Sequence, residues 1–134
     1  MSTEPITAAA ANLQDPQPNY EYLQVQATVI NFLDQEMVLT GSDLSWGKWM
    51  SSPVNVPKSD TSNFSSQGRD SSWSGTEGWV TWKVGGATIK VTFSSPYSGD
   101  NTQGISCTPD LFDVKASGTQ GHINNAKFTI KPKK

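Results

Sequence analysis

Between residues 20 and 32, apolar side chains alternate with glutamine and threonine. An alternation with a period of two predicts a strand with one buried face and one solvated face. Leu23, Val25 and Val29 fall on the apolar face. Ile30 and Phe32 fall on the other phase, which predicts either a bulge or a strand passing between two packed layers.

The clearest β-hairpin lies in the middle of the chain. Two alternating segments, 79–84 and 88–93, flank Gly85-Gly86-Ala87, and a glycine pair between such segments is a strong hairpin signal. Val80, Trp82 and Val84 point inward from the first arm, and Ile89, Val91 and Phe93 from the second. Trp79 falls on the outward phase.

The rest of the chain is divided into short β-rich runs by glycine, serine, asparagine, aspartate and proline. We predict further strands at 36–40, 44–49, 111–116 and 124–131, with a Gly-Ser-Asp turn at 41–43. Inward positions on the last two are Phe112, Val114, Ala126, Phe128 and Ile130. Residues 51–78 are expected to be mostly loop, with at most short strands near 54–56 and Phe64. No stretch has helical spacing, so the sequence predicts an all-β, antiparallel two-sheet β-sandwich.

Residues 1–19 contain few large apolar groups and are predicted to be a flexible leader. Residues 20–134 are then a single domain. The N-terminal segment has no basic start and no apolar run of a Sec-type signal, and no run approaches the roughly 20 apolar residues that span a bilayer. We therefore expect a soluble protein, cytoplasmic in the producer or released without a Sec-type signal, that meets membranes from the water side.

Charge and candidate catalytic groups narrow the function. The formal net charge of −2 and the scattered basic residues give no positive field for nucleic acid. The single cysteine, Cys107, and the single histidine, His122, are far apart in sequence, which leaves a Cys-His dyad as a remote alternative. Too few Cys and His are present for a zinc cage. We predict no enzyme activity and no cofactor.

The informative aromatics lie in or beside segments rich in serine and glycine. These are Trp46, Trp49, Trp73, Trp79 and Tyr97. Tryptophan and tyrosine combine an apolar body with a polar group, so exposed rings favour lipid headgroups or the flat face of a sugar. The alternative is that some of them cap the ends of a thin core. Arg69, the only arginine, suits phosphate by its planar fork, or else ties a loop together.

Three motifs together resemble the aegerolysin family. They are SWGK at 45–48, GRDSSWSGTEGWVTW at 68–82 and SPYSGDN at 95–101. The similarity extends from about residue 22 to the lysine-rich end, and the middle motif is the most specific. The resemblance implies a small acidic β-sandwich of the aegerolysin and actinoporin-like type. It also implies binding to membrane lipid, a sphingolipid or related headgroup, in some members together with sterol.

The resemblance further implies a role as the docking component of a two-component cytolytic or insecticidal pore. The partner in such systems is a larger perforin-like (MACPF) protein. Trp46 matches the SWGK tryptophan of the lipid-facing cluster, whereas Tyr97 replaces a family tryptophan. Ser74 stands where some members place an acid that touches the headgroup, and Glu77 follows three positions later. Trp49 and Trp73 are additional aromatics for this surface.

Two other classes of function use the same residues. In a small carbohydrate-binding sandwich, Trp73, Trp79 and Tyr97 would stack on sugar rings, while Asp100 and Asn101 bind hydroxyls. In an interaction domain, the aromatic surface would meet only another protein.

Overall fold

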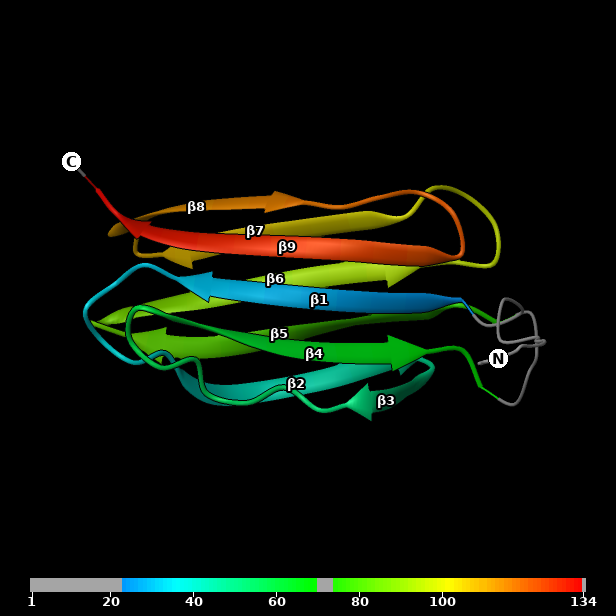
Figure 1. Cartoon of the computed structure of the whole chain (residues 1–134), viewed down its shortest axis with the longest axis horizontal. Helices are drawn as coiled ribbons and strands as arrows, with labels where there is room; N and C mark the ends of the chain where they lie inside the picture. The colour runs from blue at the N-terminus through cyan, green and yellow to red at the C-terminus, as the bar shows by residue number, and fades with distance from the viewer. Residues whose placement is uncertain (1–22, 70–73, 134) are drawn as a thin grey trace, which may run out of the picture.

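The computed structural model describes residues 23–69 and 74–133, whose strands form two packed sheets (Figure 1). One sheet has the order β3-β4-β1-β9-β8: β1 is Gln24–Asn31, β3 Lys48–Ser51, β4 Asp60–Gln67, β8 Phe112–Ser117 and β9 Ile123–Pro132. The other has the order β2-β5-β6-β7: β2 is Val38–Trp46, β5 Thr76–Val84, β6 Ala87–Ser95 and β7 Thr102–Thr108. The predicted all-β sandwich is confirmed. It is not purely antiparallel, because β1 and β9 pair in parallel.

The predicted hairpin is the centre of the four-stranded sheet. β5 and β6 pair from Thr76↔Ser95 to Val84↔Ala87, and Gly85 and Gly86 form the turn with φ values of 54° and 85°. Positive φ at both positions fits a two-residue hairpin turn. All six predicted inward side chains of the hairpin are buried. The inward positions predicted on β9 are buried as well, and Phe112 and Val114 of β8 pack against the core.

The predicted irregularity near Ile30 is wrong, because β1 stays in register with both neighbours through Asn31. The inward position after Val29 is taken by a buried polar residue, Asn31. Its amide donates to the carbonyl of Gln35 at 2.8 Å and its Oδ1 accepts from the Leu33 amide at 2.9 Å. A buried amide with these partners meets its hydrogen-bonding needs, so the strand does not break.

The predicted turn at 41–43 lies inside β2, which runs unbroken from Val38 to Trp46 with register shifts after Leu39 and Leu44. Gly41 allows this because the indole of Trp79 lies over it: a Cβ there would be 3.3 Å from Trp79 Cζ3. The glycine marks a close approach between neighbouring strands rather than a chain reversal.

The segment predicted as mostly loop, with at most a short strand near Phe64, contains β4, an eight-residue strand between β1 and β3. Its serine-rich sequence lacks an apolar alternation, yet it pairs with β1 along its whole length. β7, with glycine, serine and threonine at most positions, was absent from the prediction. Both strands are specified by their partners more than by their own side chains.

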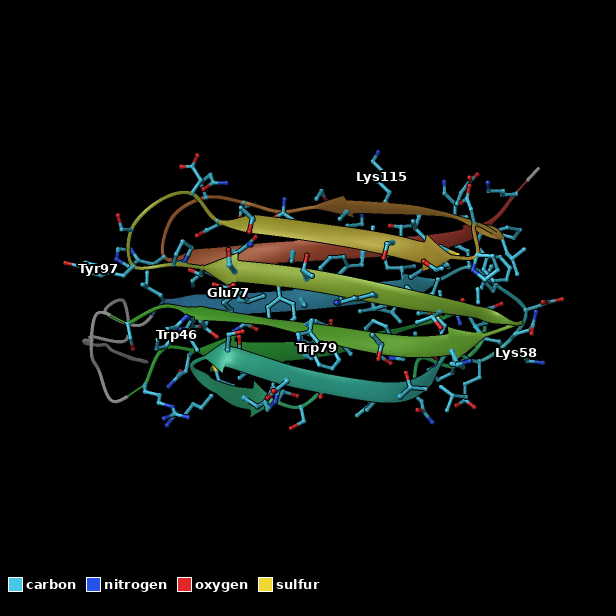
Figure 2. All side chains as sticks on the ribbon, turned by 180° about the vertical axis from the view of Figure 1, so that it is seen from behind. Trp46, Lys58, Glu77, Trp79, Tyr97 and Lys115 are labelled. Atoms are coloured by element: carbon cyan, nitrogen blue, oxygen red, sulfur yellow. The ribbon has the colours of Figure 1, made fainter. Side chains whose placement is uncertain are left out.

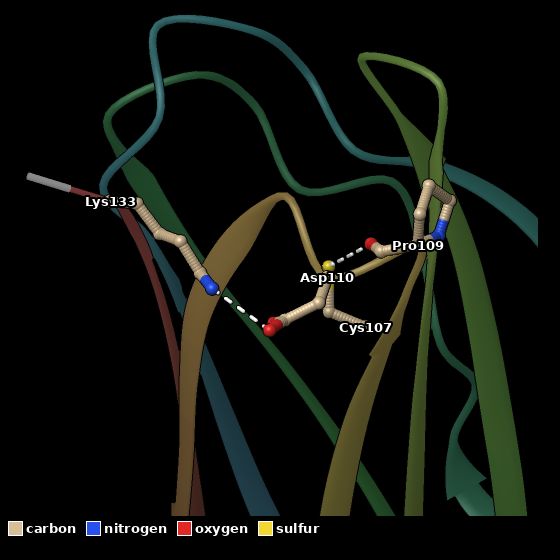
Figure 3. Close-up of polar contacts among 4 residues, drawn as sticks. All are labelled: Cys107, Pro109, Asp110 and Lys133. Carbon is tan, nitrogen blue, oxygen red and sulfur yellow. Dashed lines mark hydrogen bonds and ion pairs between the residues drawn. The ribbon is translucent and has the colours of Figure 1, made fainter.

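Polar contacts tie the C-terminal strand to the turn between β7 and β8 (Figure 3). Lys133 Nζ donates to Asp110 Oδ2 at 2.9 Å, and Cys107 Sγ donates to the Pro109 carbonyl at 3.1 Å. Both contacts lie at the end of the sandwich where β7 and β9 finish. Among the described residues, no helix is long and apolar enough to cross a membrane. The predicted leader lies outside the described residues.

Candidate functional site

The candidate site is one end of the sandwich, where β2, β4 and β6 end and β5 and β7 begin. We call it the aromatic end, because Trp46 and Tyr97 are both 65% exposed there. Figure 2 shows Trp46 and Tyr97 at this end and Lys58 at the opposite end. Of the four predicted aromatic residues that the structure describes, two therefore lie at the aromatic end.

Trp46 is held at the last position of β2 by the chain around it. Its carbonyl accepts a hydrogen bond from the buried Thr76 hydroxyl at 3.2 Å. The following residue, Gly47, has φ +97°, and a Cβ there would lie 2.6 Å from Gln67 O and from Thr76 Oγ1. Only glycine fits this turn without displacing its neighbours. The backbone is thus fixed while the indole is left in solvent.

Arg69 follows β4 at the same end and is exposed. Its Nε donates to the Gly47 carbonyl at 3.3 Å. The guanidinium therefore ties the end of β4 to the turn that carries Trp46, which is the loop-tying role considered from the sequence. Its positive charge therefore lies at the turn that follows Trp46.

Tyr97 lies in the loop between β6 and β7, which a buried amide anchors. Asn101 is 7% exposed and donates both amide hydrogens at 2.9 Å, to the carbonyls of Thr119 and Gly121. The Asn101 backbone N–H donates to Gln120 Oε1 at 2.8 Å. These bonds join the Tyr97 loop to the β8–β9 loop. Because both its amide hydrogens are engaged, Asn101 has no side-chain N–H left to donate to a sugar hydroxyl.

Glu77 and Trp79 lie on the outer face of the four-stranded sheet (Figure 2). Glu77 is exposed and pairs with Trp46 across β2 and β5. Trp79 is half-buried and two positions further from the aromatic end, with Lys90 Nζ 5.6 Å from its ring centroid. The structure therefore separates Trp79 from the exposed rings and places it on the side face of the same sheet.

Trp49 points into the sandwich and does not enlarge an exposed aromatic surface. Its ring centroid lies 6.0 Å from that of Phe64 in an edge-to-face arrangement and 6.1 Å from that of Phe93. The residue packs against the hydrophobic core. This is the core-capping role weighed as the alternative for these rings. Trp73 lies outside the described residues.

The sequence reasoning missed Lys90 and Thr92, which share the outer face with Trp79. A two-residue turn at 85–86 fixes the register of the hairpin, and this register pairs Trp79 with Thr92 and Thr81 with Lys90. The available signal was therefore the turn length, which sets which outward residues become neighbours.

The arrangement gives no support to the Cys-His alternative. Cys107 lies near the far end of β7, beside Pro109, whereas the His122 carbonyl accepts from Ser95 Oγ at the aromatic end. Six strand positions separate these ends, or about 20 Å. Within residues 23–69 and 74–133, no group of three or more His, Cys, Asp or Glu residues could hold a metal ion.

Comparisons with known proteins agree with this architecture. The aegerolysin family model matches residues 22–133. Among solved structures, the RahU protein crystallised with a TRIS molecule is similar with a TM-score of 0.74 and 18% identity, over 86% of this chain and 98% of that chain.

Two further solved structures resemble the chain. The lipid-binding protein Nakanori gives a TM-score of 0.71 and 11% identity, over 81% of this chain and 71% of that chain. IP-1A from Alcaligenes faecalis gives a TM-score of 0.66 and 18% identity, over 84% of this chain and 92% of that chain. At these identities the similarity concerns the fold. No curated protein sequence matches the chain.

Proposed function

The chain belongs to the aegerolysin family, and from this premise we propose that it binds membrane lipid through its aromatic end. The observation that carries the proposal is the pair Trp46 and Tyr97, both 65% exposed at one end. Rings of this kind lower their free energy at the headgroup level of a bilayer, where the apolar body leaves water and the polar group stays hydrated. The similar fold of the lipid-binding protein Nakanori supports lipid as the class of ligand.

The charges at the aromatic end suit a polar lipid headgroup. Arg69 brings a cation to the turn that follows Trp46, and Glu77 brings a carboxylate across the strand pair. A lipid phosphate would meet the guanidinium, and an ammonium group would meet the carboxylate. We propose a sphingolipid or related headgroup, with sterol in the same membrane. In the family pattern this lipid would be contacted by rings that sink to the interface without a spanning segment.

We further propose that the chain acts as the docking component of a two-component cytolytic or insecticidal system. Its support is the family membership, with motifs at 45–48, 68–82 and 95–101. A larger perforin-like protein would then insert after the aegerolysin has docked. On this proposal the chain alone binds vesicles without releasing an entrapped dye.

Vesicle co-sedimentation tests the docking proposal. The probes are phosphatidylcholine vesicles and vesicles of sphingomyelin or ceramide phosphoethanolamine with cholesterol. The wild-type chain is compared with the double variant Trp46→Ala/Tyr97→Ala. Phe32→Ala is the matched control, because Phe32 is an aromatic residue 54% exposed beyond the far end of β1.

We expect the double variant to lose binding to the sphingolipid vesicles and the control to retain it. Equal binding by all three proteins, or loss in the Phe32 variant alone, would place the lipid contact elsewhere. Dye release by the chain alone would contradict the need for a second protein.

A further inference from the structure

A groove of about 340 Å³ lies on the outer face of the four-stranded sheet and begins at the aromatic end. Its lining includes Trp79, Glu77, Lys90, Ser45, Thr92 and Thr102. These residues come from all four strands of the sheet. The groove is therefore a feature of the rigid sheet rather than of a loop.

Trp79 forms the apolar part of this lining. One edge of its indole lies over Gly41, so close that a Cβ there would be 3.3 Å from Cζ3. The close contact with β2 fixes the ring against the sheet, and the side chain is only half-buried. The groove thus contains a flat aromatic ring held in one orientation, with the Lys90 ammonium over the ring, 5.6 Å from its centroid.

Polar groups surround this ring, and several have no partner in the described part of the chain. Ser94 and Thr102 bond each other at 2.7 Å. By contrast, the side chains of Glu77, Thr92 and Ser45 make no hydrogen bond or ion pair to any of the described residues. They offer a carboxylate acceptor and two hydroxyls around one aromatic surface, which resembles the general composition of small-molecule sites.

The charges of the lining favour a ligand without net charge. One carboxylate, Glu77, and one ammonium, Lys90, line the same groove, so the site has no net charge to attract an anion or a cation. A carboxylate and an ammonium are instead a strong acceptor and a strong donor for hydroxyl groups. A saccharide has the matching structure, because its hydroxyls lie at the ring edge and its C–H groups form an apolar face.

We propose that this groove binds a neutral saccharide, with a sugar ring against Trp79 and its hydroxyls bonded by Glu77, Lys90 and Thr92. This subsite shares Glu77 with the lipid contact proposed at the aromatic end, whereas Trp79, Lys90 and Thr92 lie outside that contact. Glu77 and Trp79 are two strand positions apart, about 7 Å, so the groove begins at the aromatic end and extends away from it. A sugar carried on a lipid could reach it, and so could a free or protein-linked glycan.

Binding is tested by nuclear magnetic resonance titration of the full chain with a panel of neutral disaccharides: lactose, maltose, cellobiose and chitobiose. At least one is expected to shift the Trp79 indole N–H resonance and the Glu77 and Thr92 amides. Trp79→Ala and Glu77→Gln should each weaken that binding tenfold or more. Phe32→Ala, which removes an exposed aromatic ring beyond the far end of β1, is the matched control and should leave the affinity unchanged.

Glu77→Gln keeps the size of an exposed side chain, so it tests the groove even if Trp79→Ala disturbs the fold. No shift across the panel, shifts confined to other surfaces, or unchanged affinity in folded Glu77→Gln would each overturn the proposal.

A second arm identifies the source of the saccharide. Phosphatidylcholine vesicles with and without lactosylceramide are compared, with free lactose as competitor. If the wild-type chain binds the lactosylceramide vesicles more tightly than the plain vesicles, and Trp79→Ala loses this difference, the sugar is carried on a lipid. Binding of free disaccharide without this gain assigns a soluble or protein-linked glycan. The lipid proposal is judged separately, because sphingomyelin vesicles carry no sugar. Glu77→Gln should lose less binding to these vesicles than Trp46→Ala does.

Discussion

Replacing Trp46 with alanine separates membrane docking from folding. The side chain is 65% exposed, whereas its backbone carbonyl is held by Thr76 and the following turn by Gly47. None of these backbone contacts needs the indole. Substitutions of exposed side chains such as this one change the free energy of unfolding by less than about 0.5 kcal/mol. The variant should therefore melt cooperatively, at a temperature close to that of the wild type.

The loss of docking follows from the exposed area. A tryptophan side chain contributes about 250 Å² at most, so an exposed fraction of 65% leaves roughly 160 Å² that a membrane can cover. At about 25 cal/mol per Å², covering half of that area contributes about 2 kcal/mol. This corresponds to about a 30-fold increase in the dissociation constant of Trp46→Ala on vesicles.

The assay is a titration of the protein with sphingomyelin–cholesterol vesicles, followed by co-sedimentation, with a melting curve of each variant. Phe32→Ala removes an aromatic ring of similar exposure remote from the aromatic end and should change the dissociation constant less than twofold. An unchanged affinity in folded Trp46→Ala would refute the reasoning. A variant that no longer melts cooperatively would show that the indole supports the fold.

Three further predictions concern residues inside the sandwich or at its far end. Trp49→Ala should destabilise the fold by about 3 kcal/mol in denaturant unfolding, because the ring packs against Phe64 and the core; a loss of vesicle binding with unchanged stability would contradict this assignment. Asn124→Ala should cost about 2 kcal/mol or more, because this fully buried amide donates to the Ser94 carbonyl at 3.0 Å; unchanged stability would show that the bond contributes nothing. The exposed Asp110 carboxylate raises the pKa of Lys133, chiefly by a hydrogen bond; the pair therefore stabilises the fold below the ordinary lysine pKa and loses that effect as the pH rises through the raised value. Lys133→Ala should leave the melting temperature at neutral pH nearly unchanged, since such exposed pairs contribute little, and a large drop would contradict this.

The sequence was most informative where side chains alternate cleanly and the turn is short. All inward positions of the 79–93 hairpin were predicted correctly, because they are all apolar and the turn contains two glycines, although Ala87 belongs to the second strand rather than to the turn. Strand β7 was not predicted, and β4 was expected to be at most a short strand near Phe64, because serine, threonine and glycine carry no alternation in polarity. Their pairing depends on β1 and β6, which supply the backbone partners from far away in the chain.

The candidate site was likewise predictable only in part. Exposure of Trp46 and Tyr97 followed from their positions beside serine- and glycine-rich turns. The inward direction of the Trp49 side chain could not be predicted from the sequence, because β3 is only four residues long and its phase is set by pairing with β4. The groove beside Trp79 required the register across all four strands, which no local pattern contains.

The central claim, that the aromatic end faces the membrane, is tested most directly by an environment-sensitive fluorophore at each end of the sandwich. In a Cys107→Ser background, which leaves no other cysteine, the dye is attached through Tyr97→Cys or through Lys58→Cys at the opposite end (Figure 2). On sphingolipid–cholesterol vesicles, the dye at position 97 should shift to shorter wavelength and become protected from aqueous quencher, while the dye at position 58 should not change. The reverse pattern, or equal responses at both ends on membrane-bound protein, would contradict the account.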